Sequence, residues 1–433
     1  MHTVIVNWKL AILLFTMTLL TSGCATYSDH IRGVYLQLEQ QDPVAALAEL
    51  EQASGPQRDR LAYLLNRAML LRMTADYSAS NQNFEQARIL IERLDAISLR
   101  EQTGALSINE GLRSYPGEPH EQVLLHLYAA LNYLQLGQLD SARVEALQVN
   151  LRLQTLAENA NGRAYNEDPF AHYLTAMIYE ELEEWSDAMI AYRDAYQRYA
   201  ASLTLVVPEF LKHDLLRLSA KMGLSDELAS YQETFGIKKY LTVADLKSQG
   251  ELVFILHNGL APKKEQQGSR VVDYGTGRLV SIALPYYVTN DYHAQHASAL
   301  INGQAQPLET MTNIDAVAKR TLEARIPALT ARAIARAVLK DNAARRVEEE
   351  QGPLAGFFVN IVAAATEVAD TRSWWSLPHD IQVLRMPLSP AVYDIRVDLH
   401  NDDTQLGTLD FKNITITAGQ KTFVEQHWIK PAP

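Results

Sequence analysis

Two short stretches of the sequence carry histidine and carboxylate side chains at spacings close to those of catalytic or metal centres. In the first, His120, Glu121 and His126 approach the zinc-protease pattern of two histidines four residues apart on one helix. Here the second histidine follows after six residues, which places the two imidazoles on different sides of a helix. We interpret His120 as a capping residue and His126 as a core residue of a helical repeat.

The second stretch is a polar loop that contains Asp291, His293 and His296, where a transition-metal site would need a further ligand such as His257. The sequence has no G-x-S-x-G nucleophile elbow, and its carboxylate-rich stretches, such as Glu180–Glu184, are expected on solvated helix faces. We therefore predict that the protein is not an enzyme and that it holds no metal ion and no cofactor.

A third candidate is the segment DTRSWWSLP, which spans Asp370–Pro378. Asp370 and Arg372 are expected to pair and fix the loop. Trp374 and Trp375 must point to different sides of the backbone, so that one can be core while the other lines a surface. The segment is either a packed connector between a helix and a sheet or a loop whose four named residues contact a partner.

The N-terminus carries a fourth reactive group, the thiol of Cys24, which is the only cysteine in the chain. Lys9 precedes the apolar run Leu10–Leu20, and Thr21-Ser22-Gly23 follows it. The run is shorter than the ~20 apolar residues that a membrane span needs and fits the core of a signal peptide. A single cysteine also excludes an intrachain disulfide.

This N-terminus resembles a bacterial lipoprotein signal, although Thr21 stands where leucine is usual. The resemblance implies that residues 1–23 are removed and that Cys24 is lipidated. Ala25 follows the cysteine where an aspartate would imply retention at the inner membrane, so the implied location is the periplasmic face of the outer membrane. An uncleaved anchor or a plain secreted protein is the alternative.

Composition limits the partners. The chain has 433 residues, 47% of them hydrophobic, and a formal net charge of −12. Its length suggests about two or three domains. The negative charge argues against nucleic-acid binding, which needs a basic face, and it fits poorly with an anionic membrane surface.

The stretch Phe170–Tyr199 predicts two amphipathic helices that break near Glu183–Glu184. Ala176 and Ala188 are small residues at positions where the two helices must approach closely. The pattern resembles one unit of the tetratricopeptide repeat family, a helix–turn–helix of roughly 34 residues.

One such hairpin cannot bury its apolar face alone, so neighbours are expected. Related patterns span Arg60–Leu94 and Leu124–Val149, with Ser80 and Ala142 at the position of Ala188. Further helix pairs are predicted at the two ends of this array, in Tyr27–Ala53 and Pro208–Phe235. We predict a tetratricopeptide-like solenoid over residues 24–237 with a concave side that holds a protein partner.

Residues 238–433 predict a mixed α/β domain, so that the whole chain is α+β. Strands are expected at 251–256 and 279–284, the second ended by Pro285, and a strand pair in 298–307 turns at Asn302-Gly303. Alternating runs between residues 381 and 427 predict an antiparallel, β-sandwich-like unit.

Two helical segments interrupt these strands. Asn313–Glu350 is helical with a kink or restart at Pro327, and one of its faces carries basic residues: Arg325, Arg332, Arg336 and Lys340. That face is either solvated or a docking face for an acidic partner. The uncharged segment Leu354–Ala365 is too short to span a membrane, and we predict a buried helix, with a membrane-dipping segment as the alternative.

The lipidation signal, the repeats and the segment Ala369–Pro378 together resemble a family of poorly characterised tetratricopeptide lipoproteins of the bacterial envelope. The resemblance implies a protein-binding scaffold with envelope proteins as partners and a link to peptidoglycan synthesis, with neither nucleic acid nor a small-molecule substrate. The alternative is a module that binds or processes cell-wall glycan, in which Trp374 and Trp375 stack on sugar rings.

Overall fold

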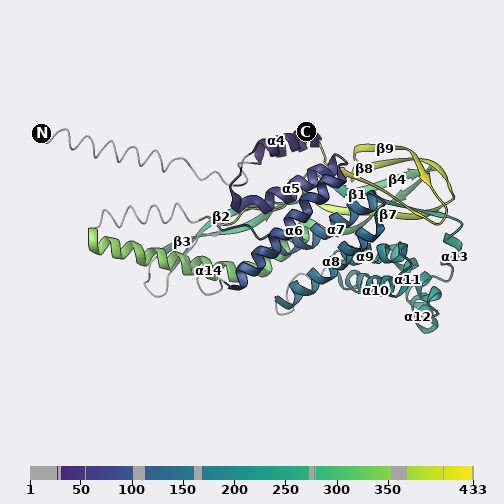
Figure 1. The fold of residues 1–433 in the computed structure, drawn as a ribbon, viewed down its shortest axis with the longest axis horizontal. Coiled ribbons are helices and arrows are strands. Elements are labelled where there is room, and N and C mark those ends of the chain that lie inside the picture. Colours follow the sequence, from purple (N-terminus) through teal and green to yellow (C-terminus); the bar gives the residue numbers. More distant parts are fainter. Residues whose placement is uncertain are drawn as a thin grey trace.

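The computed structural model describes residue 27 and residues 31–53, 55–100, 113–159, 168–272, 277, 279–352, 368–402 and 404–431. These residues form a layer of paired helices and two stacked β-sheets, from which an arm projects (Figure 1). Cys24 and the segment Leu354–Ala365 lie outside the described residues. Within the described ranges, no helix has the length and apolar character needed to cross a membrane.

The helical layer consists of consecutive helix pairs, which confirms the predicted pairs. The pairs are α3 (Arg32–Glu39) with α4 (Pro43–Gln52), α5 (Arg60–Met73) with α6 (Tyr77–Arg100), α7 (Pro119–Gln135) with α8 (Leu139–Asn159), α9 (Pro169–Glu181) with α10 (Trp185–Ala201), and α11 (Glu209–Lys221) with α12 (Ser225–Phe235). Ser80, Ala142 and Ala188 are fully buried, because each lies where the second helix of its pair meets the first. A short helix, α13 (Val243–Leu246), leads into the strands.

The first helix of each central pair is covered on all sides. In α7, 14 of 17 residues are buried, and in α9, 12 of 13. Their partners α8 and α10 each expose one face to solvent. A helix that is buried all round must have neighbours on two opposite sides, and the sheets supply the second neighbour.

Sheet A lies against the helical layer and has the strand order β10–β1–β7–β6. Its strands are β1 (Gly250–Asn258), β6 (Glu309–Asn313), β7 (Asp380–Leu388) and β10 (Lys421–Trp428). Sheet C lies on its other side and has the order β5–β4–β8–β9. Its strands are β4 (His296–Ile301), β5 (Gln304–Pro307), β8 (Ala391–Asn401) and β9 (Thr404–Ile416).

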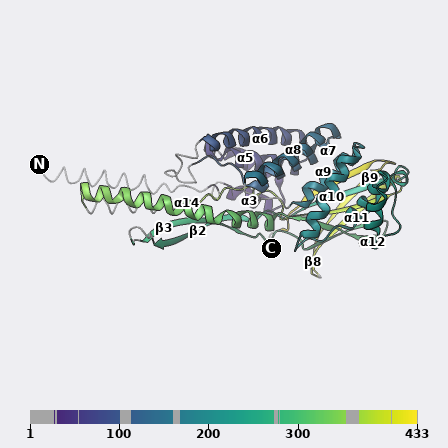
Figure 2. The same cartoon turned by 90° about the horizontal axis from the view of Figure 1, so that it is seen from below.

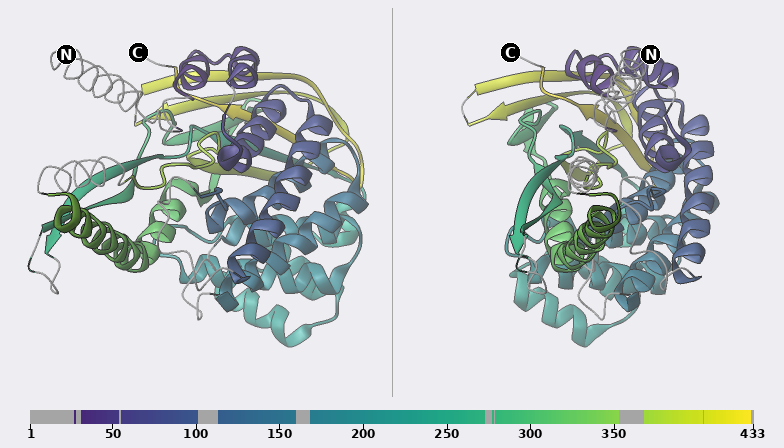
Figure 3. Two further views of the ribbon diagram at one scale, coloured as in Figure 1. Left: turned by 60° about the vertical axis from the view of Figure 1, so that its left-hand side comes forward. Right: turned by 90° about the vertical axis from the view of Figure 1, so that its left-hand side faces the viewer.

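The burial of strand β1 explains why sheet A lies between the helical layer and sheet C. All nine of its residues are buried, as expected for a strand covered on both faces. Val253 and Ile255 belong to the core shared with the helices, whereas Leu252 and Phe254 belong to the core shared with sheet C. Successive side chains of a strand point to opposite faces, so one apolar run builds both cores. The helical part and the strand part of the chain therefore share one continuous core. Figure 3 shows from two sides how the helices lie against the strands.

The predicted sandwich is present, but its strands come from a wider part of the chain. Strands β7 and β10 join β1 and β6 in sheet A, while β8 and β9 join β4 and β5 in sheet C. Strand β10 also pairs in parallel with β1, so the prediction of a purely antiparallel unit is wrong at this position. The pairing gives the doubly buried strand β1 a neighbour on each edge.

The arm consists of the hairpin β2 (Lys263–Val272) and β3 (Leu279–Val288) together with α14 (Ile314–Gln351) (Figure 2). Strand β3 does not end at Pro285, because in a two-stranded sheet a proline can turn its missing donor to the unpaired edge. Helix α14 runs on through Pro327, which is exposed, so water can replace the hydrogen bond that proline lacks. The predicted turn at Asn302-Gly303 is confirmed, with φ of 51° and 78°.

A substitution at Gly250 tests how closely β1 packs against the end of β9. A Cβ atom at Gly250 would lie 2.5 Å from Ile416 Cγ2 and 2.5 Å from the Thr417 carbonyl oxygen. Gly250→Ala should therefore lower the free energy of unfolding in urea by about 1–3 kcal/mol. Gly268→Ala in β2 is the matched control, because no atom lies within 4 Å of its added Cβ. Equal losses in both variants would contradict this packing.

Candidate functional site

The loop residues that the sequence singled out lie where the helical layer meets the sheets. Arg372 and Asp370 form the predicted pair, with Arg372 Nη2 2.7 Å from Asp370 Oδ2. The same guanidinium donates to Asp59 Oδ1 at 3.0 Å and to the backbone carbonyls of Arg58 and Arg113 at 3.0 and 2.8 Å. Arg372 therefore ties this loop to two earlier segments of the chain.

Both tryptophans of the loop are buried, with 1% of each exposed. Trp374 packs against Phe84 and Tyr128 of the helical layer, with ring centroids 5.6 and 5.8 Å apart. Trp375 belongs to a different core cluster and packs against Tyr35 in α3, at 4.6 Å. The two side chains diverge as predicted, but helices cover both of them. Neither tryptophan lies on the open surface, although Trp375 borders a cavity.

The same burial contradicts the hypothesis that Asp370, Arg372, Trp374 and Trp375 form a partner-contacting loop. Arg372 and both tryptophans are inside the protein, and Asp370 is held by Arg372. The segment is a packed connector that joins sheet A to the helical layer.

Glu121 belongs to the stretch that approaches the zinc-protease pattern, and it stabilises the same contact between the connector and the helical layer. Its Oε1 accepts from the backbone N–H of Trp374 at 2.6 Å, and its Oε2 accepts from the Tyr115 hydroxyl at 2.5 Å. Burial, together with the carboxylate of Glu118, raises the pKa of Glu121 to about 7. Glu118 is the N-cap of α7, so the interpretation of His120 as the capping residue is wrong. Both oxygens of Glu121 are thus committed to structural donors.

The histidines considered for a metal site are dispersed. His293 stacks on His379 with ring centroids 3.7 Å apart, and His379 Nδ1 lies 2.7 Å from Asp380 Oδ2. His257 points instead toward the helical layer, where its Nδ1 lies 3.2 Å from the hydroxyl of Tyr128. Among the described residues, no three His, Cys, Asp or Glu side chains are grouped so that they could hold a metal ion.

The basic face predicted on α14 is largely engaged in internal contacts. Arg336 is buried, and Arg325 pairs with Glu118 of the helical layer. Glu118 also pairs with the buried Lys264 of the hairpin. Burial alone would raise the pKa of Glu118, but these two cations lower it to about 2. Arg325 therefore fastens α14 to the body and Arg336 is buried, which contradicts the docking-face hypothesis for these two residues, whereas Arg332 is exposed.

A cavity of about 350 Å³ opens beside Trp375, and we name it the Tyr35 pocket. This volume lies within the range of roughly 300 to 1,000 Å³ typical of small-molecule sites. Lys263 Nζ lies 4.5 Å from the centre of the Tyr35 ring. Its lining combines aromatic rings, cations, hydroxyls and two carboxylates: Tyr27, Arg32, Tyr35, Glu39, Lys263, Lys264, Glu265, Thr371, Ser373 and Trp375.

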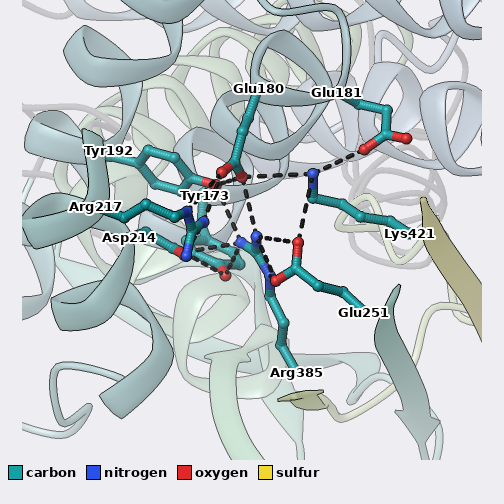
Figure 4. Close-up of polar contacts among 9 residues, drawn as sticks. All are labelled: Tyr173, Glu180, Glu181, Tyr192, Asp214, Arg217, Glu251, Arg385 and Lys421. Carbon is teal, nitrogen blue, oxygen red and sulfur yellow. Dashed lines mark hydrogen bonds and ion pairs between the residues drawn. The ribbon is translucent and has the colours of Figure 1, made fainter. Parts of the chain in front are cut away.

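The largest group of buried charges lies between sheet A and the helices α9 and α11, and we name it the ion cluster (Figure 4). It contains four carboxylates and three cations: Glu180, Glu181, Asp214, Arg217, Glu251, Arg385 and Lys421. Arg385 reaches from β7 into the helical layer, where it contacts Asp214 Oδ2 at 2.8 Å and Glu180 Oε2 at 3.0 Å. It also contacts Glu251 of β1 at 3.0 Å.

Other members complete the cluster. Arg217 Nη2 lies 2.5 Å from Glu180 Oε1 and 2.6 Å from Asp214 Oδ1. The hydroxyls of Tyr173 and Tyr192 donate to Asp214 at 2.9 Å and to Glu180 at 2.7 Å. Burial alone would raise the pKa of Glu180, but Arg217, Lys421 and Arg385 hold it well below its usual range. The cluster is a clamp between the two layers in which every carboxylate contacts at least one cation, and burial still raises the pKa of Asp214 above its usual range.

The sequence analysis missed the ion cluster, although a signal for it was present. Arg385 interrupts the apolar strand β7, and Glu251 borders the apolar run of β1. Glu180 lies at the end of the apolar face of α9. A charge within a doubly buried strand must find a partner. Because Glu251 and Arg385 lie on the same face of sheet A as Val253, they point toward the helices.

No protein-family model and no curated protein matches this chain. Solved structures resemble its helical half. The apo form of RapI is 12% identical over 48% of this chain, with a TM-score of 0.35, and this chain spans only about half (52%) of its length. A tetratricopeptide repeat protein from Parabacteroides merdae is 15% identical, with a TM-score of 0.31, over 49% of this chain and 68% of its own.

MamA from Desulfovibrio magneticus is 14% identical, with a TM-score of 0.29, over 47% of this chain and 87% of its own. At these scores the neighbours carry no argument about what this chain does. The class of the fold follows from the molecule itself: a tetratricopeptide-like layer of helix pairs, packed on a two-sheet sandwich.

The ion cluster predicts a large loss of stability when Arg385 is neutralised. Arg385→Met should lower the free energy of unfolding by about 3–5 kcal/mol, because it leaves three buried carboxylates without their shared cation. Denaturant unfolding followed by circular dichroism measures this loss. Arg396→Met is the control, because Arg396 pairs with Asp410 at the exposed surface and should matter little. An unchanged midpoint for Arg385→Met would refute the clamp.

Proposed function

We propose that the protein is a lipid-anchored scaffold on the periplasmic face of the outer membrane that binds other envelope proteins and serves cell-wall synthesis. The proposal rests on two features: the lipoprotein-like signal that ends at Cys24, and a helix-pair layer of the kind that presents helix faces to partners. A lipid tether raises the effective concentration of the scaffold near membrane-bound partners.

The observation that carries the scaffold role is the continuous core between the helical layer and sheet A. It joins the two parts into a single body, so that the outer helices and the arm are held at fixed relative positions. A rigid body of this kind is suited to holding two partners in a set geometry.

The same core requires one correction to the sequence-based hypothesis. The inner side of the array, expected to grasp a partner, is filled by sheet A and the ion cluster. The first helices α7 and α9 consequently have almost no exposed residues. A partner must bind the outer helices, the arm or sheet C.

Replacing the lipidated cysteine tests the anchor. Cys24→Ser should move the protein from the outer-membrane fraction to the soluble periplasmic fraction, because the acyl chains that hold it are lost. Cell fractionation and mass spectrometry of the mature N-terminus measure this change. The wild-type protein is the control, and affinity capture of both forms from crosslinked envelopes should recover fewer partners with the variant. A variant that stays in the membrane with a fatty-acylated N-terminus would contradict the anchor.

A second candidate function is glycan binding, and the Tyr35 pocket is the observation that favours it. Aromatic rings beside hydroxyl and cationic donors match the apolar faces and oxygen acceptors of a sugar ring. The buried tryptophans would act here only through the edge of Trp375 that lines the pocket.

Sedimentation with purified peptidoglycan tests this candidate. If the pocket binds glycan, Lys263→Glu should reduce the bound fraction about tenfold or more, because it places a carboxylate at the pocket wall. Lys239→Glu, an exposed lysine near the end of the helical array, is the control with the same change in charge. No binding by the wild type, or equal binding by both variants, would remove the glycan-binding candidate.

A further inference from the structure

The outward face of the helical layer carries an apolar stripe that nothing in the described part of the chain covers. Val144, Leu147 and Leu151 of α8 are 52%, 39% and 54% exposed. Their spacings of three and then four residues place them on one face of the helix. The opposite face of α8 carries Ala142, Ala146, Val149 and Leu153, which are buried against the neighbouring helices.

The stripe differs from other exposed apolar residues in that its members follow one another on one face of a single helix. Ile89 of α6 and Ile190 of α10 are also exposed, at 44% and 55%. Residues spaced three and four apart form the line along which one helix packs on another. Side chains of each helix then insert between side chains of its partner. A single exposed leucine needs no explanation, but a row at this spacing indicates a binding surface.

The charges around the start of the stripe are mainly acidic. Asp140 at the beginning of α8 and Asp187 of α10 are exposed. Glu184 lies beside them, and its carboxylate is paired with Arg143 at 2.7 Å. Asp187 also acts electrostatically on Arg143, which places it near the same end of α8. Glu184 pairs with Arg143 and Asp187 lies near it, so that the exposed Asp140 and Asp187 leave an excess of negative charge at this end of α8.

We propose that this face of α8 docks an amphipathic helix of another protein whose apolar seam is flanked by basic residues. The inference rests on the scaffold role and assigns it a surface and a chemical class of partner. The apolar seam of the partner packs on Val144, Leu147 and Leu151, and its basic flank lies over Asp140 and Asp187. The surface lies on the opposite side of the helical layer from the filled inner side.

The partner class predicts selective binding of a designed probe. The probe is a helical peptide with leucines at three- and four-residue spacing and lysines beside them, and a second peptide carries glutamates in place of the lysines. The full mature chain should bind the lysine peptide at least tenfold more tightly than the glutamate peptide, and added salt should reduce the difference. Fluorescence anisotropy of the labelled peptides measures both affinities.

Substitutions on the stripe locate the site. Leu147→Ser with Leu151→Ser should weaken binding of the lysine peptide about a hundredfold, because two exposed knobs are removed from the seam. Leu279→Ser with Leu339→Ser is the matched control, since it removes two exposed leucines of the arm and should leave binding unchanged. All four side chains are partly exposed, so both pairs should lower the unfolding midpoint by small and similar amounts, and a folded stripe variant is confirmed by circular dichroism.

The peptide experiments would overturn the proposal if the lysine peptide did not bind, if both peptides bound equally, or if the stripe variant retained binding. A stripe-dependent dimer in sedimentation would also overturn it, because the occupant would then be a second copy of this chain. The scaffold role is tested separately by crosslinked capture from envelopes. Partners captured equally by the wild type and the stripe variant would reject this surface and leave the scaffold role standing.

Discussion

The guanidinium of Arg385 lies where two layers of the protein meet, and the relative position of those layers depends on it. It contacts carboxylates from α9, α11 and β1, and its own side chain is only 2% exposed. A buried charge without a partner costs several kcal/mol, whereas a sliding apolar interface costs much less. Apolar burial supplies the attraction between helices and sheet, and the ion cluster selects one register among the many that apolar packing alone would allow.

This register decides which surfaces remain for other molecules. Strand β1 supplies side chains to a core on each face of sheet A, so the sheet must be covered twice. The inner side of the helix pairs provides one of these covers. It is therefore buried and not accessible to other molecules. The faces left in contact with solvent are those of α8, α10 and their neighbours, together with the arm and sheet C. The helix pairs therefore use their inner surface for the core of their own chain, and their outer surface stays in contact with solvent.

The sequence was sufficient for features that neighbouring residues determine. The helix pairs follow from local periodicity and from small residues such as Ala142 and Ala188, and the turn at Asn302-Gly303 follows from residues that tolerate positive φ. Features that join distant segments escaped prediction. The parallel pairing of β10 with β1 and the burial of Trp375 under α3 depend on contacts that no short window contains. The charge of Arg385 within an apolar strand was visible, but its partners lie on three other elements.

The parallel pairing of β10 with β1 has a consequence for how the chain is made. Lys421 and Glu181 are 240 residues apart, yet they meet in the same cluster. Synthesis proceeds from the amino end, so the helix pairs are made long before the strand that completes their cover. Until that strand is made, the apolar inner side of the helices is open to water, and contacts between such distant segments form slowly. The growing chain therefore exposes an apolar surface for an interval, and burying that surface is the last step of its folding.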